Sequence, residues 1–288
     1  MFGQKQATVY LDKTDSTKNY YKIIYPPNAS WIGYMVVLPG FGETADRVLE
    51  QSDLPIAAAK NGLLTIIPIL QDGVLSLGID DISQASLENI LLDVRNKHQL
   101  HDQKFYIGGY SIGGSCAIKY AQESKVKPTA VFAVDPPLDF ERFYHSALRS
   151  IRLTTDGNYN QEFVYMKGRL DDLMGGSPFE NIKKYYSISP YSFTDTTQSA
   201  VKKLLNQPIL IYTELEVEWW LKERQIDASS LNFVECSAFI NELNLLGNSN
   251  AILKTTYKKG YRQPDNMRHP HSWSIVNIPE LLNWLQAN

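Results

Sequence analysis

The chain has 288 residues, of which 43% are hydrophobic and 20% charged, and its formal net charge is −3. These are ordinary values for a globular protein, and they supply enough apolar side chain for a sizeable core. The weak negative charge and the absence of any Lys/Arg run argue against a nucleic-acid partner.

The chain alternates short apolar runs with helical patterns. Strands are expected at residues 8–11, 20–25, 32–38, 63–70, 105–107, 129–134, 208–212 and 251–257. Helices are expected at 54–60, 80–99, 114–121 and 237–246 and at the C-terminus. This alternation predicts an α/β fold, with a mostly parallel central sheet and helices on both faces.

Between about residues 138 and 205 the alternation fails. This stretch is rich in Tyr, Phe, Asp and Gly, and we interpret it as an insertion that lies over the site rather than as a second core. We therefore predict a single domain over residues 1–288 that carries this insertion.

Other types of protein are excluded by what the sequence lacks. The longest apolar stretches are too short for a membrane span. Cys116 and Cys236 lie far apart, so neither a disulfide framework nor a cysteine-based metal site is expected. The first residues lack a secretory apolar segment, which favours the cytoplasm, or a secreted or periplasmic location if a signal peptide has been removed. The sequence does not indicate an oligomeric state.

The most informative motif is the G-x-S-x-G pentapeptide at residues 109–113. An apolar strand precedes it and a helix of small residues follows it, which makes Ser111 a candidate nucleophile on a sharp turn. The flanking glycines fit, because a Cβ at their positions would crowd such a turn. A serine hydroxyl is a poor nucleophile at neutral pH and needs a neighbouring base, usually a histidine that an acid orients.

The candidate base lies in the loop at residues 267–273, between the last strand and the last helix. This loop falls on the edge of the sheet to which the other strands point. We expect His271 to be the base, because it directly precedes Ser272 and Trp273 and the indole ring can hold the imidazole in place. His269, which precedes a proline, is the alternative.

The acid is expected just after a strand that lies between Ser111 and His271 in the chain. Strand 208–212 leads into three alternating glutamates, and we prefer Glu216 because it clears the strand and precedes the expected Trp219–Trp220 helix. The alternates are Glu214 and Glu218. The competing interpretation is that the three glutamates form a solvated acidic turn without a catalytic role. Asp135, after the preceding strand, is a further candidate, although the two prolines behind it favour a structural turn.

The oxyanion of an acyl-transfer reaction needs backbone N–H donors. We expect one from Ile112, the residue after the nucleophile, and one from the glycine-containing loop at residues 39–42. Phe41 is the preferred donor in that loop and Gly42 the second choice.

The same loop supports a competing hypothesis. Residues 40–45 fit the pattern G-x-G-x-x-A that binds dinucleotides after a strand. Glu43 would however put a carboxylate where a pyrophosphate must bind, and the next strand ends without the acidic ribose ligand. We therefore expect no cofactor and no metal.

With Ser, Glu and His in this order, the chain resembles the α/β-hydrolase fold superfamily from about residue 32 to 284. The resemblance is carried by residues 38–42, 109–114 and 271–273. It implies a catalytic triad at the C-terminal ends of parallel strands and a cap after the sixth strand, here at about 138–205. The chain departs from many relatives in having Pro-Gly at 39–40 in place of His-Gly, and in having glutamates in place of the Gly-x-x-Asp pattern.

The His-Ser-Trp ending looks most like that of esterase-type members, including those that act on acylated carbohydrates. We therefore expect a serine hydrolase that cleaves a carboxylic ester of a small-molecule acyl substrate through an acyl-enzyme, using a Ser-His-Glu triad. A peptidase or amidase with the same triad is the first alternative. A non-catalytic binding protein on the same fold is the second.

Overall fold

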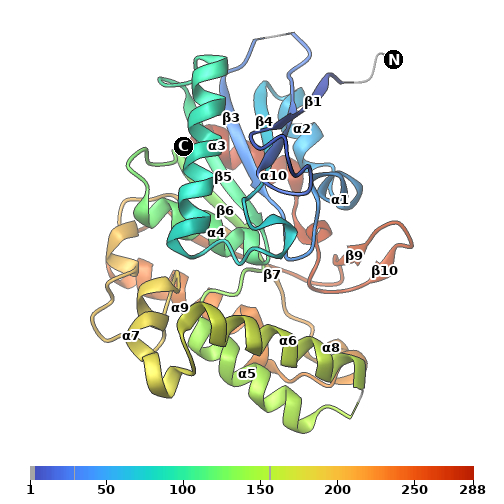
Figure 1. The fold of residues 1–288 in the computed structure, drawn as a ribbon, viewed down its shortest axis with the longest axis vertical. Coiled ribbons are helices and arrows are strands. Elements are labelled where there is room, and N and C mark those ends of the chain that lie inside the picture. The colour runs from blue at the N-terminus through green and yellow to red at the C-terminus, as the bar shows by residue number, and fades with distance from the viewer. Residues whose placement is uncertain (1–3, 29, 156) are drawn as a thin grey trace.

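The computed structural model describes residues 4–28, 30–155 and 157–288, and its centre is an eight-stranded sheet in the order β1-β2-β4-β3-β5-β6-β7-β8 (Figure 1). The strands are β1 (Gln6–Tyr10), β2 (Tyr20–Ile24), β3 (Gly33–Leu38), β4 (Leu63–Ile69), β5 (Lys104–Tyr110), β6 (Ala130–Val134), β7 (Ile209–Glu214) and β8 (Ala251–Thr256). The run from β4 to β8 is parallel, whereas β2 pairs antiparallel with both β1 and β4. Residues 1–3 lie outside the described ranges. They belong to the first part of the chain, in which the sequence shows no secretory apolar segment.

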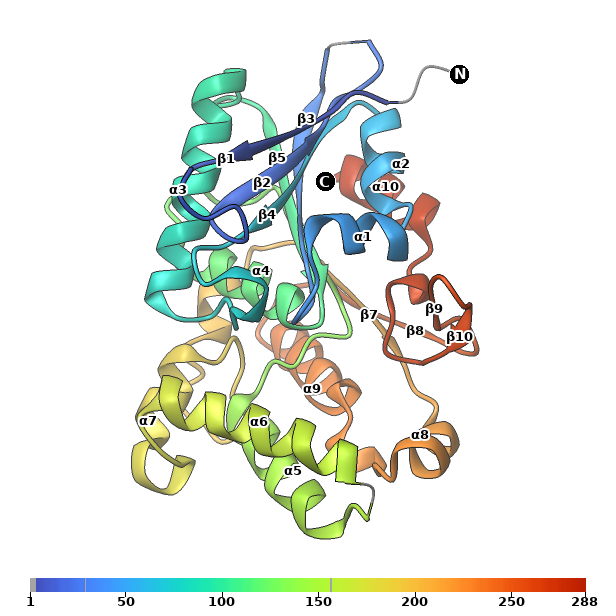
Figure 2. The same ribbon diagram turned by 45° about the vertical axis from the view of Figure 1, so that its right-hand side comes forward.

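Helices cover both faces of the sheet (Figure 2). On one face lie α3 (Asp81–His98), α4 (Ile112–Glu123) and α9 (Asn232–Leu245), and on the other α1 (Ala45–Gln51), α2 (Leu54–Lys60) and α10 (Ile278–Ala287). Successive residues of the central strands alternate between the two cores, as Met35 and Val36 of β3 do. Because both faces are covered, these strands are continuous apolar runs. The predicted mostly parallel sheet with helices on both faces is confirmed.

Helix α3 shows how the sequence specifies these layers. Leu87, Ile90, Leu91 and Val94 recur at helical spacing and are fully buried against the sheet. The helix begins after Asp80, whose carboxylate accepts a hydrogen bond from the Ser83 amide at 2.9 Å.

Between β6 and β7 the chain forms α5 (Phe140–Leu153), α6 (Gly157–Met174) and α7 (Pro178–Ile188), which gather beyond one end of the sheet (Figure 1). Phe140, Tyr144, Leu170 and Tyr185 from these helices form an apolar cluster with Ile112 at the start of α4. The helices therefore pack directly beside the serine turn. In the described part of the chain, no helix is long and apolar enough to cross a membrane.

After β8 the chain forms a small hairpin of β9 (Tyr261–Arg262) and β10 (Met267–Arg268) and then reaches the loop that carries His271. Between β7 and α9 lies α8 (Val217–Arg224), which contains Glu218, the last of the three alternating glutamates. Arg262 of the hairpin reaches Tyr110 at the end of β5, and Arg224 of α8 reaches His269 in the loop before His271.

Candidate active site

Ser111 lies on the sharp turn between β5 and α4. Its φ of 52° and ψ of −124° are outside the regions that non-glycine residues ordinarily adopt, a strain that costs about 1–3 kcal/mol and clusters at functional sites. The Ser111 amide donates to the Val134 carbonyl at 2.8 Å, which fixes the turn on β6. A Cβ on Gly109 or Gly113 would lie 2.5 or 2.3 Å from the Leu38 carbonyl oxygen. The glycines of the pentapeptide are therefore required for the approach of β3.

The two amides expected to bind an oxyanion stand near this turn. Ile112 is the first residue of α4, and Phe41 lies in the loop after β3; both residues line the cavity that contains Ser111. Neither amide donates to another group within the part of the chain that the structure describes. The Gly42 amide, by contrast, donates to the Val74 carbonyl at 2.8 Å. This leaves Phe41 as the free donor of the loop.

Glu43 fixes that loop, although it was not identified as a site residue from the sequence. Its Oε2 accepts hydrogen bonds from the Gly40 amide at 2.8 Å and from Trp273 Nε1 at 3.1 Å. Burial raises the pKa of the Glu43 carboxyl, and these two donors act in the opposite direction. One carboxyl group thus joins the loop of Phe41 to the segment that follows His271.

His271 has an acidic partner, and that partner is Asp135. Its Nδ1 lies 2.6 Å from Asp135 Oδ2, and both side chains are largely buried. Asp135 directly follows β6 and has a φ of +47°. Its amide donates to the Tyr212 carbonyl at 2.7 Å, and its carbonyl accepts from Asn232 Nδ2 at 2.8 Å. The aspartate is therefore held on both sides, with its carboxylate toward the imidazole.

The backbone of His271 is anchored as well. Its carbonyl oxygen accepts hydrogen bonds from the Tyr110 hydroxyl at 2.8 Å and from Arg262 Nη2 at 3.1 Å. The ring of Tyr110 stands beside the imidazole, with 4.6 Å between the ring centroids. Tyr110 precedes Ser111 in the chain, so one residue connects the serine turn to the histidine loop.

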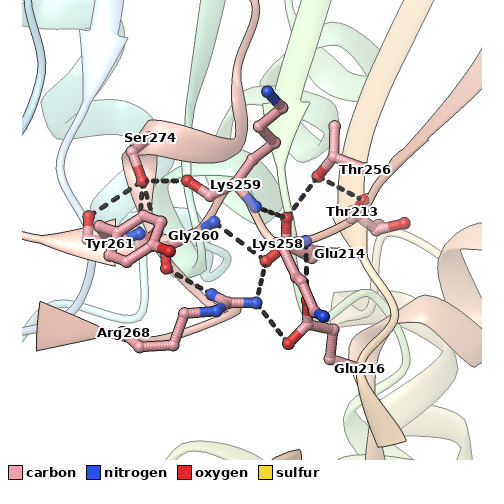
Figure 3. A network of polar contacts seen from close by, with 11 residues as sticks. Thr213, Glu214, Glu216, Thr256, Lys258, Lys259, Gly260, Tyr261, Arg268 and Ser274 are labelled. Atoms are coloured by element: carbon pink, nitrogen blue, oxygen red, sulfur yellow. Dashed lines mark hydrogen bonds and ion pairs between the residues drawn. The ribbon is translucent and has the colours of Figure 1, made fainter.

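The preference for Glu216 as the acid is corrected by this geometry. Glu216 Oε2 forms an ion pair with Arg268 at 2.5 Å, and its Oε1 accepts from the Lys258 amide at 2.7 Å (Figure 3). The alternate Glu218 lies exposed on α8. The glutamates do not hold the imidazole because Arg268, three residues before His271, forms ion pairs with Glu214 and Glu216.

The other alternate, Glu214, is fully buried and fully hydrogen-bonded. Its Oε1 accepts from Arg268 Nη2 at 2.6 Å and from the Gly260 amide at 2.9 Å. Its Oε2 accepts from the Lys259 amide at 2.7 Å and from Thr256 Oγ1 at 2.9 Å (Figure 3). Glu214 therefore holds the hairpin that leads to His271, and it does not hold the imidazole.

His269, the alternative base, is buried in a cage of aromatic rings. The centroids of Trp219 and Trp220 lie 4.9 and 5.4 Å from that of its ring, and Arg224 Nη1 lies 3.4 Å from its Nε2. Burial, followed by the positive charge of Arg262, lowers the pKa of His269 to about 2. Its ring is therefore neutral, and it supports the loop from behind.

The site is open to a ligand through a cavity of about 410 Å³. Ser111, Ile112, Phe41 and His271 line it together, whereas the three glutamates of the β7–α8 segment do not. Among the described residues, no group of three or more His, Cys, Asp or Glu side chains could hold a metal ion. Four residues singled out from the sequence, Ser111, Ile112, Phe41 and His271, thus line one cavity, whereas Glu216 lies outside its lining.

No protein-family model matches the sequence, and no curated protein matches it either. Solved structures do share its architecture. An S-formylglutathione hydrolase from Agrobacterium tumefaciens is 15% identical with a TM-score of 0.63, and the alignment covers 100% of this chain and 96% of that enzyme. FphF, a fluorophosphonate-binding serine hydrolase of Staphylococcus aureus, is 14% identical with a TM-score of 0.57, over 97% of this chain and 98% of FphF.

A third similar structure is longer than this chain. The acylaminoacyl peptidase of Pyrococcus horikoshii is 12% identical with a TM-score of 0.63, over 98% of this chain but only 41% of the peptidase. At these identities the similarity concerns the fold. The chain has the α/β-hydrolase fold, as its sequence motifs predicted.

Proposed function

We propose that this protein is a serine hydrolase that cleaves a carboxylic ester through an acyl-enzyme, with Ser111 as nucleophile, His271 as base and Asp135 as acid. The observation that carries the proposal is the 2.6 Å contact between His271 Nδ1 and Asp135 Oδ2, in a cavity that both His271 and Ser111 line. A carboxylate only accepts hydrogen bonds, so Nδ1 carries the ring proton and Nε2 is free to accept another. That is the tautomer a general base needs.

The first half of the reaction acylates the serine. His271 Nε2 takes the proton of Ser111 Oγ as the oxygen attacks the carbonyl carbon, and the amides of Ile112 and Phe41 hold the resulting oxyanion. The tetrahedral intermediate collapses, the C–O bond to the alcohol breaks, and the alcohol leaves with the proton from His271. The carboxylate of Asp135 stabilises the imidazolium between these two proton transfers.

The second half releases the acid. A water molecule gives a proton to His271 and attacks the acyl carbon, and the same two amides again hold the oxyanion. Collapse returns the proton to Ser111 Oγ and frees the carboxylic acid. The cap is part of the proposal: helices α5 to α7 would form the wall that excludes bulk water, because Phe143 and Met166 from them line the cavity.

We favour esters over amides because of the lengths of the similar proteins. The S-formylglutathione hydrolase and FphF match this chain over nearly their whole length, whereas the peptidase has a further portion that this chain does not span. We therefore propose a small-molecule acyl substrate. Because the His-Ser-Trp ending resembles that of esterases that act on acylated carbohydrates, an acylated carbohydrate is included among the test substrates.

A fluorophosphonate probe and a pair of matched substrates test the proposal. We expect the probe to label Ser111 in the folded protein and to leave Ser111→Ala and heat-denatured protein unlabelled. Turnover of 4-nitrophenyl butyrate should exceed that of the 4-nitroanilide of butyric acid, and an acetylated sugar extends the ester panel. An unlabelled Ser111, with His271→Ala indistinguishable from wild type, would favour a binding protein. Faster turnover of the anilide would favour the amidase.

A further inference from the structure

A second cavity adjoins the first on the other side of His271. It has a volume of about 160 Å³ and is lined by Asp135, His269 and Trp220 among others. Six residues line both cavities and therefore form the boundary between them: Phe143, Glu162, Met166, Asn232, Arg262 and His271. Arg262 and His271 thus face both cavities.

Most charged side chains around the second cavity have a partner of opposite charge. Glu162 pairs with Arg224 at 2.8 Å, and Glu214 pairs with Arg268 at 2.6 Å. Asp135 is engaged by His271. The carboxylates that line this cavity are thus already bound to other groups.

Arg262, unlike these charged side chains, forms no ion pair within the described residues. Its Nε and Nη2 donate to the His271 carbonyl oxygen at 3.3 and 3.1 Å, and Nη2 also approaches the Tyr110 hydroxyl at 3.4 Å. These are neutral oxygens, and within the described residues no carboxylate oxygen comes within 4 Å of the guanidinium. Glu43, whose carboxyl interacts electrostatically with Arg262, is turned to Gly40 and Trp273.

The guanidinium is also fixed in position. Two of its nitrogens are held against the backbone of the catalytic loop, while Nη1 donates to no group in the described chain. A half-buried cation without a carboxylate in ion-pair contact, as found here among the described residues, favours an anionic ligand, and a planar guanidinium suits a carboxylate above all. Because the group is pre-positioned, little side-chain entropy is lost when the ligand binds.

We infer that Arg262 binds a carboxylate of the substrate, so that the preferred substrates are esters that carry an anionic group on the acyl or the alcohol arm. This inference rests on the proposed ester hydrolysis, which it makes more specific. Arg262 is then a specificity-determining residue, and its hydrogen bonds to the His271 carbonyl also make it a positioning residue. The test must separate these two roles.

Two substrate pairs provide that separation. For the acyl arm, 4-nitrophenyl hydrogen glutarate is compared with 4-nitrophenyl pentanoate. For the alcohol arm, the acetate ester of 4-hydroxybenzoate is compared with that of 4-hydroxybenzamide. A loss of His271 positioning lowers kcat/KM for both members of a pair, whereas a loss of carboxylate binding lowers it only for the anionic member.

We expect Arg262→Gln to lower the ratio of kcat/KM, anionic over neutral, by about 10- to 100-fold in one of the two pairs, the size of a charged hydrogen bond. Arg262→Lys keeps the charge and should retain part of the preference. Arg149→Gln is the control: Arg149 lines neither of the two cavities and is paired with Asp227, so the ratio should stay unchanged. If Arg262→Gln does not fold, the lysine variant and the salt dependence of the wild-type ratio give the same readout.

An unchanged ratio in both pairs, with neutral esters still hydrolysed and Ser111 still labelled by the probe, would overturn the role of Arg262 and leave the proposed hydrolase intact. Absence of labelling and of all ester turnover would overturn the proposed function itself. The two failures are therefore distinguishable.

Discussion

Replacing Asp135 by Asn should nearly abolish catalysis, whereas replacing Glu216 by Gln should not. Asp135 Oδ2 lies 2.6 Å from His271 Nδ1, and the Asp135 side chain is only 10% exposed, so solvent screens the pair weakly. Asn removes the charge and keeps the shape. Asn is also among the residues that tolerate a positive φ, and Asp135 has a φ of +47°, so the substitution adds little backbone strain.

The magnitude follows from the charge that develops on the imidazole. In the transition state His271 is positive, and a carboxylate about 4 Å from the ring charge contributes about 4 kcal/mol at an effective dielectric constant near 20. This corresponds to roughly a 10³-fold loss of kcat. Asn also presents an N–H to the ring, which favours the wrong tautomer and brings the expected loss to about 10³- to 10⁴-fold.

Steady-state hydrolysis of 4-nitrophenyl butyrate measures this loss, with fluorophosphonate labelling of Ser111 as a second readout and thermal unfolding as a check that the variants fold. Glu216→Gln removes charge from the pair with Arg268 and is expected to lower kcat by less than about 10-fold. Equal losses in the two variants, or a larger loss for Glu216→Gln, would refute the assignment of Asp135.

The remaining predictions concern the surroundings of the site. Glu214→Gln should lower the free energy of unfolding by about 3 kcal/mol in denaturant titration and reduce kcat, because it breaks a buried ion pair that holds the histidine loop; unchanged stability would contradict this role. Gly113→Ala should give unstable, inactive protein, because the new Cβ would lie 2.3 Å from the Leu38 carbonyl oxygen, whereas Gly168→Ala on α6 has open space and should raise the melting temperature. For His269, the folded pKa is lowered to about 2 from 6.5, so the unfolded chain gains a proton below pH 6.5 that the folded chain does not. Wild type should thus lose about 1 kcal/mol of stability through this residue between pH 6.5 and 5.5, and His269→Phe should not, as unfolding titrations at both pH values can show.

The fold could be predicted from the sequence because local patterns determine it. Buried strands are continuous apolar runs, α3 repeats its apolar residues at helical spacing, and glycines mark the serine turn. The region between β6 and β7 could not be resolved into its three helices in this way. In α5 the buried Phe140, Tyr144 and Ala147 do recur at helical spacing, but Phe140 and Tyr144 pack on Ile112 and on the neighbouring helices instead of on the sheet. The alternation of strands with helices that identified the other elements is therefore missing here.

The acid that we now propose could not be chosen from the sequence because two strand ends satisfy the same rule. Asp135 follows β6, and the glutamates begin with Glu214, the last residue of β7, so both positions lie at the edge where the histidine loop arrives. Which carboxylate contacts His271 depends on the other side chains that the histidine loop carries to this edge. Arg268 arrives with the loop and neutralises the glutamates, and no pattern in the sequence predicts that a cation three residues before the histidine will do so.

The two acidic groups therefore have different tasks, and the nature of their partners explains the division. Glu214 is bound to a guanidinium whose charge does not change during the reaction, so its interaction is equally strong in the ground state and the transition state. Asp135 is bound to an imidazole that, in the proposed mechanism, becomes positive only during proton transfer, so its interaction would strengthen in the transition state. Only an interaction of the second kind accelerates a reaction. A carboxylate already paired with arginine is suited to holding a loop in place, whereas Asp135, whose partner is the imidazole of His271, fits the proposed role of triad acid.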